Sequence, residues 1–85
     1  MNKRIAIVGI IIEDSGQNKK VQEILHQYGE FILGRMGIPR VEERMNIISV
    51  VVRAEQKDIA ALSGKLGNLE KVTAKAIYKQ EKKDE

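Results

Sequence analysis

The chain has 85 residues, a formal net charge of +3 and no cysteine. This length corresponds to a single domain, and the missing cysteine excludes disulfides, thiolate metal sites and cysteine catalysis. No apolar run is long enough to span a membrane. The basic and apolar start runs into Glu13 and Asp14 without a small-residue cleavage site, so we expect a cytoplasmic protein.

The first predicted element is a strand over residues 4–12, which are rich in isoleucine and valine. Both faces of its alternation are apolar: Ile5, Ile7 and Ile11 on one, and Ala6, Val8, Ile10 and Ile12 on the other. Both sides of this strand should therefore be covered. After a turn, a helical stripe follows at Val21, Ile24, Leu25 and Tyr28, and Gly29 is expected to end this helix in a left-handed conformation.

Residues 30–38 predict a second strand that stops at Pro39 or lies at a sheet edge, because proline cannot donate to the ladder. Gly34 and Gly37 indicate a bulge or the close approach of another backbone, or they simply permit a twist before the turn. Residues 44–53 predict a third strand. Its faces carry Ile48, Val50 and Val52 on one side and Met45, Ile47 and Val51 on the other.

The last two elements are a helix over residues 54–69 and a strand over residues 69–78. In the helix, Ile59, Leu62 and Leu66 share a face, and Gly67 is a natural terminator. The strand alternates between apolar and polar residues. We expect residues 1–79 to form one domain and the charged residues 80–85 to form a mobile tail.

This order of elements predicts an α+β protein with a ferredoxin-like βαββαβ sandwich: a four-stranded antiparallel sheet with both helices on one face. The first and third strands are then central. The uncovered face would carry several large aliphatic side chains, and such patches usually mark interfaces. We therefore predict a homo-oligomer, a dimer or tetramer, with an interface that includes Ile7, Ile11, Gly34, Gly37, Ile47 and Val51.

Few residues point to chemistry. The loop from Asp14 to Asn18 offers backbone amides near a helix N-terminus, where an anion or carboxylate can bind; alternatively, Ser15 or Asn18 only caps the helix. His26, the only histidine, makes a metal site only if symmetry brings copies together. The adjacent carboxylates at 13–14 and 42–43 point to opposite faces, and no nucleophile or phosphate loop is present. We predict neither a catalytic nor a metal site, and hence no enzyme.

Nucleic-acid binding is the main alternative. The stretch GRMG matches the G-x-x-G of KH loops, but there the motif joins helices, whereas strands flank it here. RRM domains share this fold and stack bases on aromatic residues of the central strands. Residues 4–12 and 44–53 contain no aromatic, and the net charge is mild. Direct binding or a co-repressor role in transcriptional regulation therefore has weak support.

The stretches FILGRMGIP, ERMNIISVVV and ALSGKLGNLEKVTAKAIY resemble the small proteins named as regulators of the iron-only hydrogenase system. The resemblance spans nearly the whole chain and groups it with ACT-like domains and the C-terminal domain of the nickel-responsive repressor NikR. It implies a ferredoxin-like, oligomeric domain that regulates through a small molecule or a metal. The repressor's nickel site uses several histidines and a cysteine, so it cannot be transferred to this chain.

ACT domains often bind amino acids at a subunit interface, near a glycine in the first strand–helix loop, and Gly16 has a similar position. We therefore predict a non-enzymatic, oligomeric regulatory module with a small-molecule effector, such as an amino acid, bound between subunits. The sequence does not identify a cofactor, and a purely structural assembly partner with no ligand is a third reading. The predicted ligand site comprises Asp14, Ser15, Gly16 and Asn18, facing Arg35 and Met36 of a neighbouring subunit. Arg35 would bind a carboxylate or phosphate.

Overall fold

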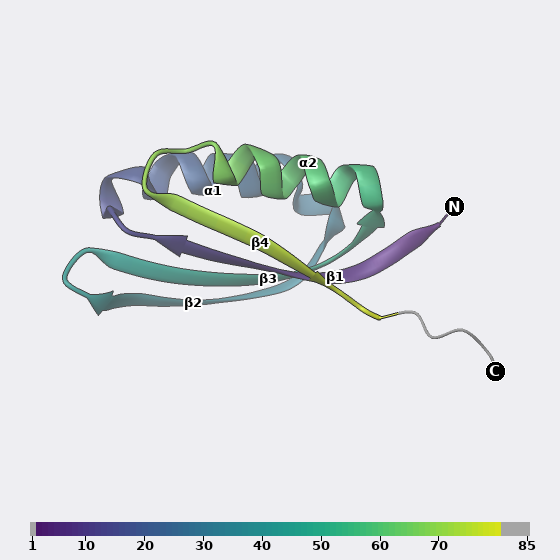
Figure 1. Ribbon diagram of the computed structural model, residues 1–85, viewed down its shortest axis with the longest axis horizontal. Coiled ribbons are helices and arrows are strands. Elements are labelled where there is room, and N and C mark those ends of the chain that lie inside the picture. The colour runs from purple at the N-terminus through teal and green to yellow at the C-terminus, as the bar shows by residue number, and fades with distance from the viewer. Residues whose placement is uncertain (1, 81–85) are drawn as a thin grey trace.

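A computed structural model describes residues 2–80 of the chain. Its elements are β1 (Lys3–Ile12), α1 (Asn18–Gln27), β2 (Ile32–Glu42), β3 (Met45–Glu55), α2 (Gln56–Gly67) and β4 (Val72–Tyr78). The strands form one antiparallel sheet in the order β2-β3-β1-β4, and both helices lie on the same side of it (Figure 1). The ferredoxin-like α+β sandwich is therefore confirmed, with the first and third strands central.

The core lies between the sheet and the two helices. Alternate residues of β1 and β3 point toward the helices and are buried, because each strand sends successive side chains to opposite faces. The helices close this layer with Val21 and Leu25 from α1 and with Ile59, Leu62 and Leu66 from α2. No polar or charged residue among residues 2–80 is buried in this layer, so its stability depends on apolar packing.

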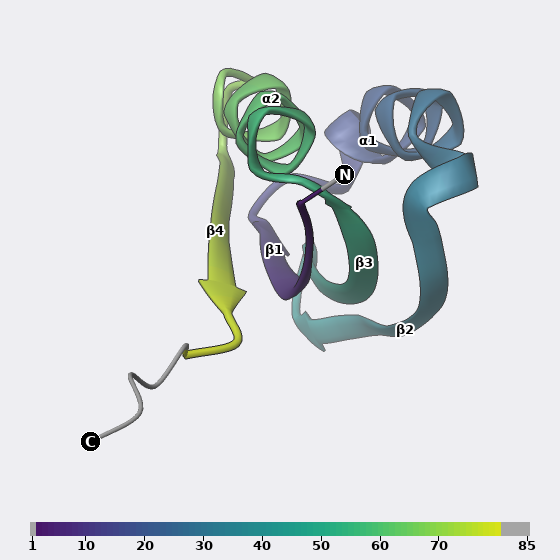
Figure 2. The ribbon, with the colours of Figure 1, turned by 90° about the vertical axis from the view of Figure 1, so that its right-hand side faces the viewer.

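The opposite face of the sheet, which we call the open face, has no helix over it (Figure 2). Ile7 and Ile11 of β1 lie there with 43% and 39% of their surface exposed, and Ile77 of β4 is 68% exposed. Gly9, opposite Ser49 of β3, leaves a shallow apolar depression of about 410 Å³ near the middle of this face. The chain therefore has an apolar sheet surface that its own helices do not cover.

The second strand differs from its prediction at both ends. Residues Gly29–Phe31 form a short 3-10 helix, so β2 begins at Ile32, and it then continues past Pro39 to Glu42. Proline is tolerated because β2 is an edge strand, and because its register with β3 is irregular between Ile38 and Glu42. A second irregularity, just before Gly34, agrees with the bulge that this glycine indicates.

Three further boundaries needed correction. No glycine among the described residues has a positive φ, so Gly29 does not end α1 in a left-handed conformation. Residues 54 and 55 belong to β3 and not to α2, because Ala54 is buried and pairs with Arg4 of β1. The last strand begins at Val72 rather than at residue 69, after a turn in which Lys71 has a φ of 65°. The predicted tail lies outside the described residues, except for its first residue.

Two neighbouring residues of β1 test the assignment of faces. Ile10→Ala should lower the free energy of unfolding by about 2–5 kcal/mol, because the side chain is fully buried. Ile11→Ala should cost less than half of that, because its side chain lies on the open face. Urea denaturation at low protein concentration measures both. Equal losses would contradict the assignment.

Candidate functional site

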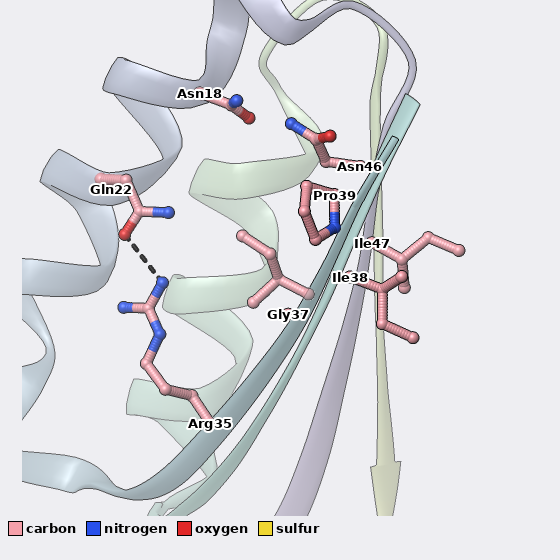
Figure 3. A pocket seen from close by; sticks show the side chains of 9 residues that line it. Asn18, Gln22, Arg35, Gly37, Ile38, Pro39, Asn46 and Ile47 are labelled. Carbon is pink, nitrogen blue, oxygen red and sulfur yellow. Dashed lines mark hydrogen bonds between the residues drawn. The ribbon is translucent and has the colours of Figure 1, made fainter. Parts of the chain in front are cut away.

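A surface pocket of about 370 Å³ lies between the start of α1 and the β2–β3 hairpin (Figure 3). Its lining residues are Asn18, Gln22, Arg35, Gly37, Ile38, Pro39, Asn46, Ile47 and Ile48. Gly37 pairs with the buried Ile48, so it is on the helix side of β2, where a larger residue would extend into this space. The missing side chain at Gly37 therefore helps to keep the pocket open.

Arg35 provides the positive charge of the pocket. Its register partner is Val50, which faces the helices, so the arginine side chain reaches from β2 toward α1. Its Nη2 donates a hydrogen bond of 2.8 Å to Oε1 of Gln22 on α1 (Figure 3). A guanidinium has five N–H donors, and this bond uses only one of them. The others can bind a carboxylate or a phosphate.

Asn18 provides an oxygen that needs a donor. It is the first residue of α1, and its side chain points toward the pocket (Figure 3). Its Oδ1 is shielded from solvent and has no hydrogen-bond partner. A buried acceptor without a partner costs about 1–3 kcal/mol.

Asn46 is held in place by a strained residue. Its Oδ1 accepts a hydrogen bond of 2.9 Å from the backbone N–H of Arg40, which has a left-handed φ of 57°. Because the oxygen is engaged, the amide nitrogen of Asn46 is left to donate, and it faces the Asn18 oxygen across the pocket (Figure 3). Strained backbone often occurs at binding sites. Here it fixes the orientation of a polar group in the pocket.

The structure separates the residues of the predicted ligand site. Asn18 and Arg35 line one pocket of a single chain, whereas the prediction placed them on two subunits. Met36 points to the open face and is 64% exposed. Asp14, Ser15 and Gly16 do not line the pocket, and Ser15 is exposed. A ligand at this loop remains a prediction.

The loop before α1 is held by its own hydrogen bonds. Oδ1 of Asp14 accepts the backbone N–H of Gly16 at 2.9 Å and a guanidinium N–H of Arg44 at 3.0 Å. Asp14 thus caps the 3-10 helix Ser15–Gln17, and α1 has no side-chain cap. The alternative that Ser15 or Asn18 caps the helix is therefore wrong. The Gly16 bond and, next, the Arg44 charge hold the pKa of Asp14 below its usual value of 3.8.

Sequence reasoning missed two polar lining residues, Gln22 and Asn46. Asn46 could have been found from the alternation of β3. It lies two residues before Ile48 and four before Val50, so its side chain is on the same, helix-facing side of the strand, where a polar residue is unusual. Gln22 is an ordinary exposed helix residue, and only the tertiary contact with Arg35 marks it.

Metal ligands do not cluster in the described part of the chain. Within residues 2–80, no three histidine, aspartate or glutamate side chains lie close enough together to hold an ion. His26 is exposed on α1. None of the described helices is long and apolar enough to cross a membrane.

The chain was compared with known families and structures. The profile of the family described as "TM1266-like: Iron-only hydrogenase system regulator, putative" matches residues 4–76. The chain is also similar to the solved structure of the uncharacterized protein TM1266 from Thermotoga maritima. The two share 40% sequence identity and a TM-score of 0.87, over 93% of this chain and 100% of that one. No curated protein sequence gave a significant match. These findings confirm the resemblance seen in the sequence.

The two contacts of Asp14 can be separated by titration. We expect Arg44→Gln to raise the pKa of Asp14 while leaving it below 3.8, because the Gly16 hydrogen bond, the largest single cause of the lowering, remains. Since the folded-state pKa is lowered, the stability from this carboxylate is present above pH 3.8 and is lost as the pH falls through the folded-state pKa. NMR titration of the Asp14 carboxyl carbon measures the shift. A full return to the usual value would contradict the order of causes.

Proposed function

Because the chain belongs to the TM1266-like family of iron-only hydrogenase system regulators, we propose that it is a non-enzymatic regulatory module. In this proposal, copies of the chain associate through their open faces, and each copy binds a small molecule or ion in the pocket beside Arg35. The bound ligand changes which assembly is favoured. The link to the hydrogenase system comes from the family description alone.

The open face supports the assembly step. Its central strands present Ile7 and Ile11 from β1 together with Ile47 and Val51 from β3, and the edge strand β2 adds Ile38, which is 52% exposed. A contiguous apolar surface of this kind usually marks an interaction site. A second copy offers a surface of matching chemistry, and symmetric self-association is the commonest way to cover one. An 85-residue chain also gains much from burying further apolar area.

The pocket supports the ligand-binding step. The polar groups that line it come from three elements, with Asn18 on α1, Arg35 on β2 and Asn46 on β3. The Asn18 oxygen has no partner, and the Arg35 guanidinium retains free donors. Pockets that combine apolar walls with a few converging polar groups are typical binding sites. The Arg35 guanidinium, which lines the pocket and uses one of its five donors on Gln22, is the single observation that carries this part of the proposal.

The β2–β3 hairpin connects the two sites. Gly37 and Asn46 face the pocket, whereas the adjacent Ile38 and Ile47 point to the other side of the sheet (Figure 3). A ligand that repositions the hairpin therefore changes the open face as well. The ligand can shift the assembly equilibrium only by the difference between its binding free energies for the two positions of the hairpin.

Nucleic-acid binding stays a prediction without further support. Tyr28, Phe31 and Tyr78 are all the tyrosines and phenylalanines of the chain, and each packs against the core. They therefore provide no stacking platform on the open face, and the remaining argument is the net charge of +3.

Self-association tests the first half of the proposal. We expect light scattering to show dimers or larger assemblies, and Ile7→Lys to dissociate them, because a lysine in the middle of an apolar interface leaves a charge buried. Gln27→Lys is the matched control, since this residue is exposed on α1, away from the open face. A wild-type protein that stays monomeric at high concentration contradicts the proposal.

Coupling between the pocket and the open face tests the second half. Gly37→Leu places a side chain in the pocket and should change the self-association constant by about fivefold or more. Gly64→Leu adds the same side chain to the exposed surface of α2 and should leave the constant unchanged. If Gly37→Leu does not fold, Gly37→Ala is the milder version, because its Cβ would meet the Ile47 oxygen at an ordinary 3.8 Å. Identical association constants for all variants would remove the coupling.

A further inference from the structure

We infer that the outer edge of β4 is a docking site for an extended, acidic segment of another protein, which adds to the four-stranded sheet as a further strand. The backbone of β4 supplies the hydrogen bonds, and Lys75 and Lys79 select acidic side chains. No residue of β4 lines the pocket beside Arg35, so docking here is a second interaction, beyond the proposed function.

The backbone of β4 has hydrogen-bonding groups directed away from the sheet. In an antiparallel ladder, alternate residues direct their N–H and C=O groups toward one neighbour, and the residues between them direct theirs to the other side. The N–H of Lys79 donates to the oxygen of Ile5 in β1 at 3.1 Å, and the register with β1 is unbroken along β4. The odd-numbered residues therefore bond to β1, whereas Ala74 and Ala76 present their backbone groups outward. No strand within residues 2–80 pairs with this side, because β4 is the last strand of the sheet (Figure 2).

The other edge of the sheet is protected against strand addition. β2 has two irregularities in its register with β3, and it contains Pro39, which has no N–H, and Arg40, which has a left-handed φ of 57°. Prolines and bulges are common means by which an edge avoids pairing with another strand. β4 contains no proline, and all seven of its residues are in register with β1. Of the two edges, β4 is therefore the one that can accept a strand.

The side chains along this edge are basic. Lysines stand at positions 71, 75 and 79, and no acidic residue lies between them. Lys71 is opposite Glu13, whose N–H donates to its backbone oxygen at 2.8 Å. Lys75 and Lys79 are exposed, and neither forms a salt bridge among the described residues. Because opposite charges on neighbouring strands stabilise their pairing, an acidic strand matches this edge.

A second copy of the chain does not suit the edge. When two strands pair, a long side chain reaches the residue directly opposite and the residues diagonal to it. The lysines recur every four residues, so any antiparallel pairing of two β4 strands through their outward groups puts Lys75 opposite or diagonal to a lysine of the other copy. Like charges in these positions weaken the pairing. A strand with carboxylates at alternate positions turns the same contacts into attractive ones.

Hydrogen exchange measured by NMR tests the docking site. The acidic probe is a short peptide with blocked ends, in which glutamates alternate with threonine and valine, and the control peptide has lysines in place of the glutamates. In the free protein, the N–H groups of Ala74 and Ala76 should exchange faster than those of Lys75 and Ile77, which bond to β1. The acidic peptide near saturation should slow exchange at Ala74 and Ala76 by about tenfold or more, and the basic peptide should not.

Two variants separate the backbone from the charge. Ala76→Pro removes an N–H that points away from β1, which an edge strand tolerates, and it should abolish the slowing at Ala74. Lys75→Glu leaves the backbone intact. It should weaken the acidic peptide and strengthen the basic one, each by about twofold to fivefold, as expected for an exposed charge pair. Lys20→Glu, on the exposed surface of α1 far from β4, is the matched control and should keep the preference for the acidic peptide (Figure 2).

Three outcomes would overturn the inference. The first is equal binding of the acidic and basic peptides, and the second is unchanged exchange at Ala74 and Ala76 when the acidic peptide is added. The third is slow exchange of these two amides in the free protein, which would assign the edge to a second copy. If Ala76→Pro does not fold, the peptide preference of Lys75→Glu decides. None of these outcomes alters the tests of the proposed function, which use variants outside β4.

Discussion

The structure depends on one imbalance: its sheet has two apolar faces, and its helices form one layer. The central strands β1 and β3 are responsible, because in each of them both the helix-facing set and the open-face set of side chains are largely aliphatic. In most half-covered sheets, polar residues on the solvent side fix the register, since a slip by one residue would bury them. Here that role falls to a few open-face residues, including Ser49, Arg53 and Lys75. They determine which face receives the helices.

The same alternation explains why the fold was readable from sequence and why some boundaries were not. Apolar residues that repeat every two residues in the strands and every 3.6 residues in the helices predicted the order of the elements and the two faces of β1. The order of the elements in turn predicted that the strand containing Pro39 lies at the edge of the sheet. Ala54 and Glu55 were misassigned because both are favourable helix residues. Pairing of Ala54 with Arg4 of β1 outweighs that local preference. The end of β2 was misplaced because an irregular edge tolerates proline, and Arg40 gives no sequence sign of its left-handed backbone.

The pocket was harder to predict because it depends on distances between elements. Loop chemistry together with the family resemblance identified Asn18 and Arg35, and the fold brings both into one cavity. Their association within one chain follows from the path of β2 beside α1, which the sequence pattern does not specify. Gly37 appeared as a candidate for the interface of the oligomer, but its pairing with Ile48 places it on the helix side of the strand. The three-residue separation of Gly34 and Gly37 puts them on opposite faces, so these glycines have different structural roles.

β2 is the least buried strand of the sheet. Beyond Ile32, every residue of β2 is exposed, so this strand is held mainly by its pairing with β3 and by single side-chain bonds such as Arg35 to Gln22. Segments with little buried area are the ones that move at low cost. In the proposed function, a molecule bound in the pocket beside Arg35 would link α1 to β2 and would thereby fix the hairpin relative to the helix layer. Because Ile38 and Ile47 lie on the reverse side of the same hairpin, fixing it also fixes part of the surface that a second copy would contact (Figure 3).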